Sequence, residues 1–295
     1  MGNFRHAYLI IAHNNFKVLE KLIRAIDDER NDIYIHIDKK TKDISIDHLK
    51  NLAKKANSIN VYQKINTNWG GYSLPKVELF LLSKATKERH AYYHLLSGAD
   101  FPLKSQDMIH DFFLQNNGKE FVQVCDVYKD WTNRIKYYWF FQETVGRYNS
   151  ENLKLKQKLA RRVQKVLLNI QKKINVDRIH NQFAVYSGSQ WFSITHEAAL
   201  YVIDNENFIK HHFRYSNCSD ELFLPILIGN SKFNDKTASN NNLRHIDWNR
   251  GRPYVFKSSD YEELINCDDL FARKFDQNKD LEIIDKLYEH ITMRG

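Results

Sequence analysis

Carboxylates placed just after buried strands are the first residues in this sequence whose spacing suits chemistry. The clearest case is Asp100, which follows the apolar run 92–96 and the turn residues Ser97 and Gly98. Ligands of open α/β sheets bind outside the carboxyl ends of the strands, so we expect Asp100 to line a ligand crevice. A strand-to-helix loop without any ligand explains the pattern equally well, since Ser105 is a good helix N-cap.

The elements that must position such residues alternate between strands and helices over the first 125 residues. Apolar runs predict strands at 6–12, 32–37, 59–62, 92–96 and 121–124. Apolar residues at helical spacing predict helices at 18–26, 46–56, 73–85 and 106–115. This alternation is typical of βαβ units, so the predicted fold class is α/β, with a Rossmann-like, mostly parallel sheet flanked by helices. The strand ends should meet at one edge, where the candidate ligand-binding residues are Ala12, His13, Asp38, Trp69, Gly70, Gly71, Tyr72 and Asp100.

Composition limits the class of protein and the kind of partner. A chain of 295 residues with 42% hydrophobic residues can bury a large core, and its net charge of +8 favours an anionic partner. That partner can be a nucleotide, a phosphorylated lipid, a membrane surface or a nucleic acid. There is no CxxC pair, no signal-like N-terminus and no apolar run that could span a bilayer. We therefore expect a cytoplasmic protein, with peripheral contact to the inner face of the cell membrane left open.

Two basic segments in the middle of the chain each have two interpretations. Residues 130–148 are rich in aromatic and basic side chains, which suits a groove for a sugar chain or single-stranded nucleic acid, but equally a core loop. Residues 153–174 carry an apolar stripe at helical spacing on an otherwise basic helix. That pattern suits a helix on an anionic membrane surface, and also an ordinary surface helix docked through its stripe.

The later part of the chain has weaker signals. Ser219 is the expected N-cap of a helix at 222–228, with Asp220 and Glu221 in its first turn, and a strand is expected at 243–248. Acidic residues favour helix N-termini for electrostatic reasons alone, so this pattern does not by itself predict catalysis.

Several common catalytic motifs are missing. The sequence has no GxxxxGK[ST] phosphate loop, no GxGxxG after a strand and no GxSxG elbow. The pairs His90 with His94 and His211 with His212 lack the companion ligands of a metal site. There is also no Asp-x-Asp, the pair that holds a divalent cation on the diphosphate in many sugar-nucleotide enzymes. If the chain binds a nucleotide diphosphate, we expect Arg and Lys side chains of the C-terminal segment to meet its charge.

Seven motifs, taken in order, resemble the core-2/I-branching β-1,6-N-acetylglucosaminyltransferases (glycosyltransferase family 14), a family that includes the peptide O-xylosyltransferases. They cover most of the chain and lie at 10–15, 35–40, 69–73, 95–105, 187–192, 219–221 and 271–276, with the sequences IIAHNN, IHIDKK, WGGYS, LLSGADFPLKS, SGSQWF, SDE and FARKFD. The likeness is to bacterial-type members, because the cysteines of secreted animal members are missing.

The resemblance implies one GT-A domain over 1–295, with a nucleotide-binding half at 1–125 and an acceptor-binding, catalytic half at 126–295. It implies an inverting transfer of N-acetylglucosamine or xylose from a UDP-sugar to a glycan acceptor, with no obligatory metal or other cofactor. The acceptor is expected to be a bacterial surface polysaccharide unit, which a lipid carrier can hold, and no nucleic-acid partner is expected.

The resemblance also implies roles for individual residues. Glu221 takes the role of the catalytic base. Lys274 neutralises the UDP diphosphate together with an arginine, for which Arg252 fits best and Arg244 and Arg250 are competitors. The strand-end residues from Ala12 to Asp100 named above would hold the uridine and the donor sugar.

Two other classes of function fit parts of the sequence. A non-catalytic basic module would bind nucleic acid or anionic glycan through 130–148 and 153–174, with an affinity that falls steeply with salt and without binding UDP. A metal-dependent glycosyltransferase of other specificity would lose its activity in EDTA and regain it with manganese.

Overall fold

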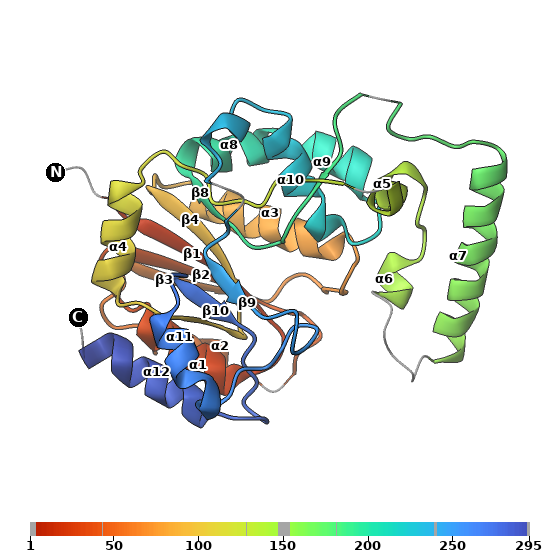
Figure 1. Cartoon of the computed structure of the whole chain (residues 1–295). Coiled ribbons are helices and arrows are strands. Elements are labelled where there is room, and N and C mark those ends of the chain that lie inside the picture. Colours follow the sequence, from red (N-terminus) through yellow and green to blue (C-terminus); the bar gives the residue numbers. More distant parts are fainter. Residues whose placement is uncertain are drawn as a thin grey trace.

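A five-stranded sheet forms the centre of the protein in the computed structural model, which describes residues 4–42, 44–127, 129–146, 154–180, 182–238 and 241–293. Its order is β3-β2-β1-β4-β8, and only β8 runs antiparallel to its neighbour. The strands are β1 (His6–Ala12), β2 (Asn31–Ile37), β3 (Ser58–Tyr62), β4 (Tyr92–Ser97) and β8 (Ser193–Thr195) (Figure 1). The predicted α/β class, with a mostly parallel sheet flanked by helices, is confirmed.

Successive residues of the central strands pack against helices on opposite faces of the sheet. In β1, Tyr8 and Ile10 belong to one buried cluster, whereas Ala7 and Leu9 belong to the other. The first cluster is covered by α1 (Phe16–Ala25), α2 (Ile46–Lys50), α4 (Gln106–Gln115), α11 (Tyr261–Asn266) and α12 (Glu282–Met293). The second is covered by α3 (Ser73–Ala85), α8 (His196–Asp204), α9 (Glu206–Phe213) and α10 (Phe223–Gly229), which lie above the sheet in Figure 1.

A second, three-stranded sheet brings the C-terminal part of the chain to the carboxyl end of β4. Its order is β5-β10-β9, with β10 antiparallel to β5 and parallel to β9. The strands are β5 (Asp100–Pro102), β9 (Arg244–Ile246) and β10 (Phe271–Arg273). Because β5 begins three residues after β4 ends, this pairing places the motif at 271–276 beside the predicted ligand edge.

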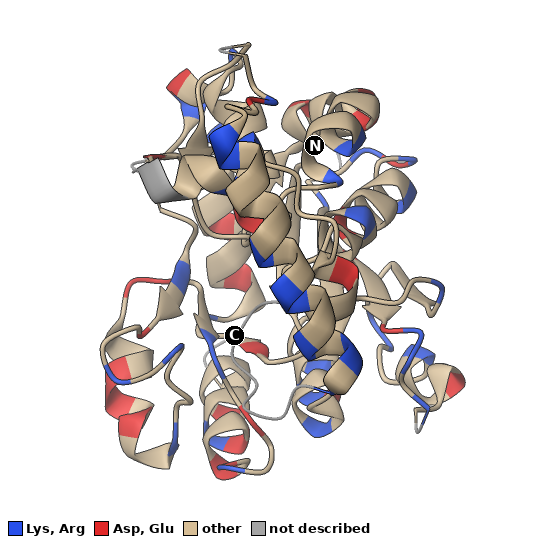
Figure 2. Ribbon diagram, turned by 90° about the vertical axis from the view of Figure 1, so that its right-hand side faces the viewer, with Lys and Arg blue, Asp and Glu red and all other residues tan. Residues whose placement is uncertain are grey.

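Other elements complete the described part of the fold. They are β6 (Cys125–Asp126), α5 (Lys129–Lys136), α6 (Gln142–Val145), α7 (Leu155–Lys173), β7 (Tyr186–Ser187) and the 3₁₀ turns Ser219–Glu221, Asn234–Lys236 and Ser258–Asp260. Helix α7 stands at the outer edge of the molecule, away from both sheets (Figures 1 and 2). No helix in the described ranges is long and apolar enough to cross a membrane.

Several predicted elements need correction. The strand at 121–124 is wrong, because Phe121 makes only an isolated bridge to Ser193. The helix expected at 46–56 ends at Lys50, and the strand expected at 243–248 is limited to β9.

The helix predicted within 153–174 is confirmed, although residue 153 lies outside the described residues. Residues 147 and 148 of the basic, aromatic segment at 130–148 also lie outside them. The predicted capping role of Ser219 is wrong, because its hydroxyl has no hydrogen-bond partner among the described residues and it begins a separate 3₁₀ turn.

Three buried histidines pack together between β1, β4 and α4. The rings of His6 and His110 stack 4.0 Å apart, and His94 Nε2 lies 3.1 Å from His6 Nδ1. Burial lowers the pKa of all three histidines, that of His110 to about 4. They are therefore neutral in the folded protein at neutral pH, whereas unfolded histidines gain a proton near pH 6.5.

This cluster predicts a loss of stability in mild acid. Between about pH 6.5 and pH 4 the unfolded chain binds protons that the folded chain cannot, so the free energy of unfolding falls as the pH falls. We expect His110 alone to contribute a decrease of roughly 3 kcal/mol across this range. Urea unfolding at several pH values should show a flatter dependence in His110→Gln than in the wild type or in the exposed control His48→Gln. An unchanged slope in His110→Gln would contradict this.

Candidate active site

Two adjoining pockets lie at the carboxyl edge of the central sheet. The first, of about 410 Å³, is called here the strand-end pocket and is lined by Ala12, His13, Asn14, Asp38, Lys40, Thr67, Ser97, Gly98 and Lys274. The second, of about 700 Å³, is called the Glu221 pocket and is lined by Gln123, Trp131, Ser187, Gly188, Asp220, Glu221, Arg244 and Trp248. Both share a wall made by Trp69, Gln190, Trp191, Arg252, Pro253 and Arg273.

The strand-end pocket contains one carboxylate among several cations. Asp38 accepts hydrogen bonds from Thr67 Oγ1 (2.6 Å) and from the backbone N–H of Lys40 (2.8 Å). Burial alone would raise the pKa of Asp38, but these bonds and the Lys40 charge outweigh it and lower the pKa. Asp38 is therefore ionised at neutral pH and can accept a hydrogen bond from a ligand.

The cations of this pocket are Lys40, Arg252, Arg273 and Lys274. The side chains of Arg252 and Lys274 make no ion pair or hydrogen bond within the described part of the chain. No three His, Cys, Asp or Glu side chains among the described residues form a group that could hold a metal ion. The excess positive charge suits an anionic ligand such as a diphosphate.

Arg273 was not singled out by the sequence, and it depends on Asp100. The fully buried carboxylate of Asp100 accepts bonds from the N–H and hydroxyl of Ser97 and pairs with Arg273 Nη1 at 3.0 Å. The Arg273 guanidinium also lies over the Trp191 ring, 4.2 Å from its centre. Asp100 therefore positions a pocket cation and does not itself line either pocket. The motif at 271–276 was the available signal, although only Lys274 was taken from it.

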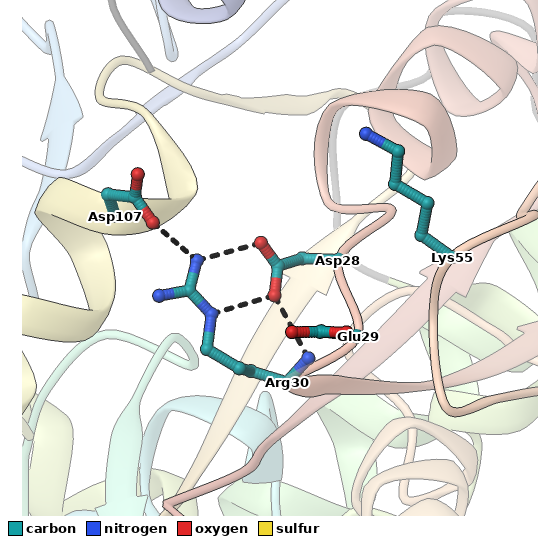
Figure 3. A pocket seen from close by; sticks show the side chains of 5 residues that line it. All are labelled: Asp28, Glu29, Arg30, Lys55 and Asp107. Carbon is teal, nitrogen blue, oxygen red and sulfur yellow. Dashed lines mark hydrogen bonds and ion pairs between the residues drawn. The ribbon is translucent and has the colours of Figure 1, made fainter.

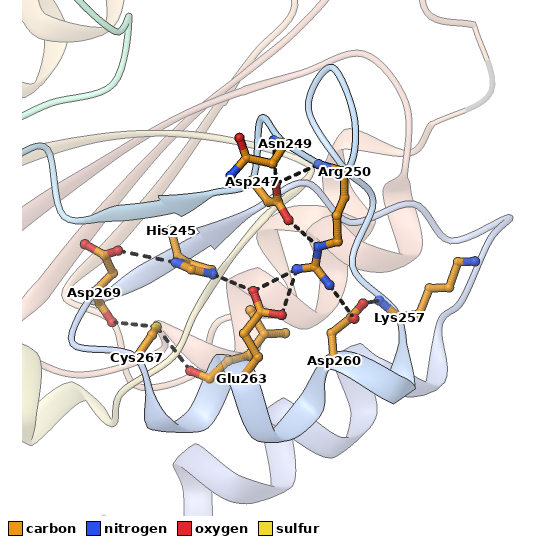
Figure 4. A network of polar contacts seen from close by, with 10 residues as sticks. His245, Asp247, Asn249, Arg250, Lys257, Asp260, Glu263, Cys267 and Asp269 are labelled. Carbon is orange, nitrogen blue, oxygen red and sulfur yellow. Dashed lines mark hydrogen bonds and ion pairs between the residues drawn. The ribbon is translucent and has the colours of Figure 1, made fainter.

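The three arginines that competed for the diphosphate lie in different surroundings. Arg252 lines both pockets, whereas Arg250 is held by Asp247, Asp260 and Glu263 in a surface network (Figure 4). Arg244 borders the Glu221 pocket but is buried, and burial lowers the pKa of Arg244 to about 9. Of the three, Arg252 is best placed to meet an anionic ligand.

The buried guanidinium of Arg244 is used inside the protein. It donates to backbone oxygens of Leu95 (3.0 Å) and Phe192 (2.6 Å) and to the Ser193 hydroxyl (2.9 Å). Arg244 therefore joins β9 to the central sheet at β4 and β8.

The glycine-rich segment after Trp69 shapes the loop that carries this ring. Gly70 has a positive φ of 79°, which favours glycine, and a Cβ on Gly71 would lie 2.6 Å from Glu143 Oε1. Glu143 accepts hydrogen bonds from the N–H (2.8 Å) and hydroxyl (2.9 Å) of Ser73 and so caps α3. Of the predicted residues in this segment, Trp69 lines both pockets, and Gly70, Gly71 and Tyr72 line neither.

Glu221 is positioned by contacts of its main chain and its carboxylate. The N–H of Gly188 donates to the carbonyl oxygen of Glu221 at 3.1 Å, and the carboxylate pairs with Arg134 at 2.7 Å. Arg134 in turn lies over the Trp131 ring, 3.7 Å from its centre. A Cβ on Gly188 would lie 2.1 Å from the carbonyl oxygen of Gln123, so this close approach requires glycine.

A buried glutamate, Glu78, holds the side chain of Gln190, which belongs to the shared wall. The Nε2 of Gln190 donates to Glu78 Oε1 at 3.0 Å. Burial, with the nearby charge of Asp220, raises the pKa of Glu78 well above its usual value and so favours its protonated form. Neither Gln190 nor Arg134 was predicted as a site residue from the sequence. Gln190 lies within the motif at 187–192, whereas Arg134 lies in none of the seven motifs.

A separate pocket of about 520 Å³ lies at the opposite edge of the sheet (Figure 3). It adjoins the amino end of β2, where Arg30 pairs with Asp28 at 2.7 Å and Asp107 at 2.6 Å. Because Arg30 is already paired with two carboxylates and the pocket lies away from the carboxyl ends of the strands, it is not a candidate for the active site.

The fold and the two pockets define an α/β protein with a cationic ligand site at the carboxyl edge of its sheet. The sequence pattern of the family described as "Core-2/I-Branching enzyme" matches residues 6–265. The chain therefore belongs to the Core-2/I-branching enzymes, a family of glycosyltransferases, as the sequence motifs predicted.

Several relatives of this chain are xylosyltransferases. The chain is 24% identical to dog (Canis lupus familiaris) xylosyltransferase 2 over 314 residues, which cover 97% of this chain and 34% of the relative. It is 25% identical to mouse (Mus musculus) xylosyltransferase 1 over 314 residues, covering 98% and 30%. The chain thus spans about a third of the length of the curated relatives it matches. Mouse xyloside xylosyltransferase 1 aligns over 94% of this chain and 99% of its own, at 10% identity and a TM-score of 0.37, a value too low to support an argument.

The pairing of Asp100 with Arg273 makes a prediction about stability. Asp100→Asn removes the charge that compensates Arg273, and loss of one partner of a largely buried ion pair typically costs about 3 kcal/mol. Urea unfolding should show a loss of this order relative to the wild type. The exposed control Asp111→Asn on α4 should change the free energy of unfolding by less than about 0.5 kcal/mol. Equal effects of the two substitutions would show that the pair does not hold this part of the site.

Proposed function

We propose that this chain transfers a sugar from a UDP-sugar to a hydroxyl group of a glycan acceptor. The nucleotide would occupy the strand-end pocket and the acceptor the Glu221 pocket. The observation that carries the proposal is the wall common to both pockets: Arg252 and Arg273 lie between a pocket that suits a diphosphate and a pocket that contains a carboxylate. Family membership supports the same class of reaction.

The strand-end pocket supports a role in binding the donor. Asp38 is an ionised acceptor that suits a uracil N–H or a ribose hydroxyl, and Ala12 and His13 line the same pocket. The diphosphate would face Arg252, Arg273 and Lys274, whose charges would stabilise the departing UDP without an obligatory metal ion. Relatives named xylosyltransferases make UDP-xylose the first donor to test, and UDP-N-acetylglucosamine the second.

The Glu221 pocket supports base catalysis. The acceptor hydroxyl would give its proton to Glu221 while its oxygen bonds to the anomeric carbon. The bond from that carbon to the β-phosphate oxygen would break, and its electron pair would leave with UDP, so the anomeric configuration would be inverted. Such base catalysis typically contributes about 10²–10⁴-fold, and Arg134 would hold the carboxylate in place.

Tryptophan rings line the pocket that we assign to the acceptor. Trp69, Trp131 and Trp248 line the Glu221 pocket, and Trp69 and Trp248 are more than half exposed. Flat, exposed rings suit stacking on the apolar faces of sugar rings, which supports a glycan acceptor. A surface-polysaccharide unit on a lipid carrier is our proposed acceptor class, and the basic helix α7 is the feature that favours it.

Glu221→Gln tests the catalytic assignment. Since glutamine cannot accept the proton, we expect kcat for sugar transfer to fall by about 10²-fold or more, with the affinity for UDP unchanged. Radiolabelled transfer and calorimetry measure the two quantities. The exposed control Glu289→Gln on α12 should behave as the wild type. A folded Glu221→Gln variant with near wild-type kcat would show that another group is the base.

A further inference from the structure

Helix α7 presents an apolar face to solvent. Leu155, Leu159, Val163, Val166 and Ile170, with Ile174 just after the helix, recur every three or four residues and so share one face. Each of these side chains is between 39% and 84% exposed. We call this set the outer stripe. A surface helix normally buries its apolar stripe against the protein, so among the described residues the outer stripe lacks the contact that its pattern predicts.

The helix is held to the protein by another face, which is largely polar. Its buried residues are Ala160, Gln164 and Gln171. Gln164 accepts a hydrogen bond from the N–H of Phe140 (2.8 Å), and Gln171 accepts one from the N–H of Tyr138 (2.7 Å). Both glutamines also donate to the carbonyl oxygen of Tyr138. The interpretation that this helix docks through its apolar stripe is therefore wrong, and the stripe remains available.

All of the chain's net positive charge lies on this helix together with its N-cap residue, Lys154. Residues 154–173 contain eight Lys or Arg and no Asp or Glu, while the whole chain has 44 basic and 36 acidic residues. The other 275 residues therefore have 36 of each sign and no net charge. In Figure 2 the basic positions run along the whole length of α7, at the front of the molecule.

We propose that α7 docks on the surface of an anionic phospholipid bilayer, lying in the plane of the interface. The outer stripe would enter the boundary between headgroups and acyl chains, and the flanking Lys and Arg side chains would meet the lipid phosphates. Their aliphatic stems allow these side chains to reach the headgroups while the stripe is buried. This inference does not depend on the proposed function, because neither pocket contains a residue of α7.

Charge argues against the other occupants of this face. A second copy of the chain would bring together two segments 154–173, each of charge +8, with no acidic residue on either to compensate them. Nucleic acid would satisfy the charge but would leave the apolar side chains of the outer stripe in water. An anionic membrane is the partner that satisfies both the charge and the stripe.

A helix docked in this way would be connected to the candidate active site through α6. Helix α6 packs against α7, and its Glu143 holds the loop that carries Trp69. The neighbouring Gln142 donates to the carbonyl oxygen of Ser216 at 2.7 Å, shortly before the turn that carries Glu221. Through α6, the membrane-facing helix is thus connected to both pocket walls.

Vesicle flotation with the full chain tests the proposal. The probes are vesicles of phosphatidylcholine alone and vesicles in which roughly one-third of the lipid is phosphatidylglycerol. We expect at least about tenfold stronger partitioning to the anionic vesicles, weakened by added salt. The combined substitution Leu159→Gln, Val166→Gln and Ile170→Gln keeps the charge but removes most of the stripe, so binding should fall by about tenfold or more.

Matched controls separate the two contributions. Leu114→Gln changes an equally exposed apolar residue on α4 and should bind as the wild type. Lys158→Gln, Lys165→Gln and Lys172→Gln together should lose the preference for anionic vesicles, whereas Lys76→Gln, Lys87→Gln and Lys279→Gln should keep most of it. Circular dichroism checks that α7 remains helical in each variant.

Three results would overturn the proposal. They are equal partitioning of the wild type to both kinds of vesicle, wild-type binding by the stripe variant, and a stripe-dependent dimer in light scattering. The first and third results are measured on the wild-type chain, and the stripe variant is needed only to show that a dimer forms through the stripe. The proposal therefore stays testable even if a variant does not fold.

Discussion

The pairing of β10 with β5 is the constraint on which the candidate site depends. Asp100 is fully buried at the first position of β5, and a buried carboxylate is costly unless it is paired and hydrogen-bonded. The antiparallel register places Arg273 opposite Asp100, and their ion pair satisfies that requirement. A slip of one residue would put a different side chain opposite Asp100 and turn Arg273 to the other face of the strand. The same register therefore fixes where Arg273 lies, and places the adjacent Lys274 beside the strand ends.

The two pockets differ in whether their charged side chains are already paired. In the strand-end pocket, Arg252 and Lys274 are left without a partner in the described ranges, which keeps them available for an anionic ligand. In the neighbouring pocket, the carboxylate of Glu221 already has a cation, because Arg134 pairs with it and is itself stacked on Trp131. Charged groups fixed before a ligand arrives do not need to reorganise during a reaction. This arrangement is consistent with leaving-group stabilisation on one side of the shared wall and a positioned base on the other.

Local patterns predicted those parts of the fold that local interactions determine. The strands β1, β2 and β4 and the helices α1, α3 and α4 follow from apolar runs, helical spacing and turn residues, and the edge where their ends meet follows from βαβ topology. The second sheet has no such signal, because Asp100 and Arg273 are 173 residues apart. For the same reason, local patterns predicted that Asp100 lines the ligand crevice. In the structure Asp100 instead lines neither pocket and holds Arg273 in place.

Helix α7 shows a different limit of prediction. Its helical period was correct, but the period alone does not say which face meets the protein. Gln164 and Gln171 bind backbone groups that have no partner in a sheet or helix, and that requirement outweighs burial of the apolar stripe. Arg134 was not predicted as a site residue because its partner Glu221 lies 87 residues away in the chain. No local sequence pattern links two residues at that separation.

Calorimetric titration of UDP into the wild-type chain in the presence of EDTA tests whether the strand-end pocket binds the donor nucleotide through its cations. We expect selective binding of UDP over ADP and GDP without a metal ion. We also expect at least about tenfold weaker binding in Lys274→Ala, because a diphosphate would lose one of its charged partners. Binding of UDP only with manganese would contradict the assignment of the diphosphate charge to Arg252, Arg273 and Lys274. No nucleotide binding under either condition would contradict the proposed donor site itself.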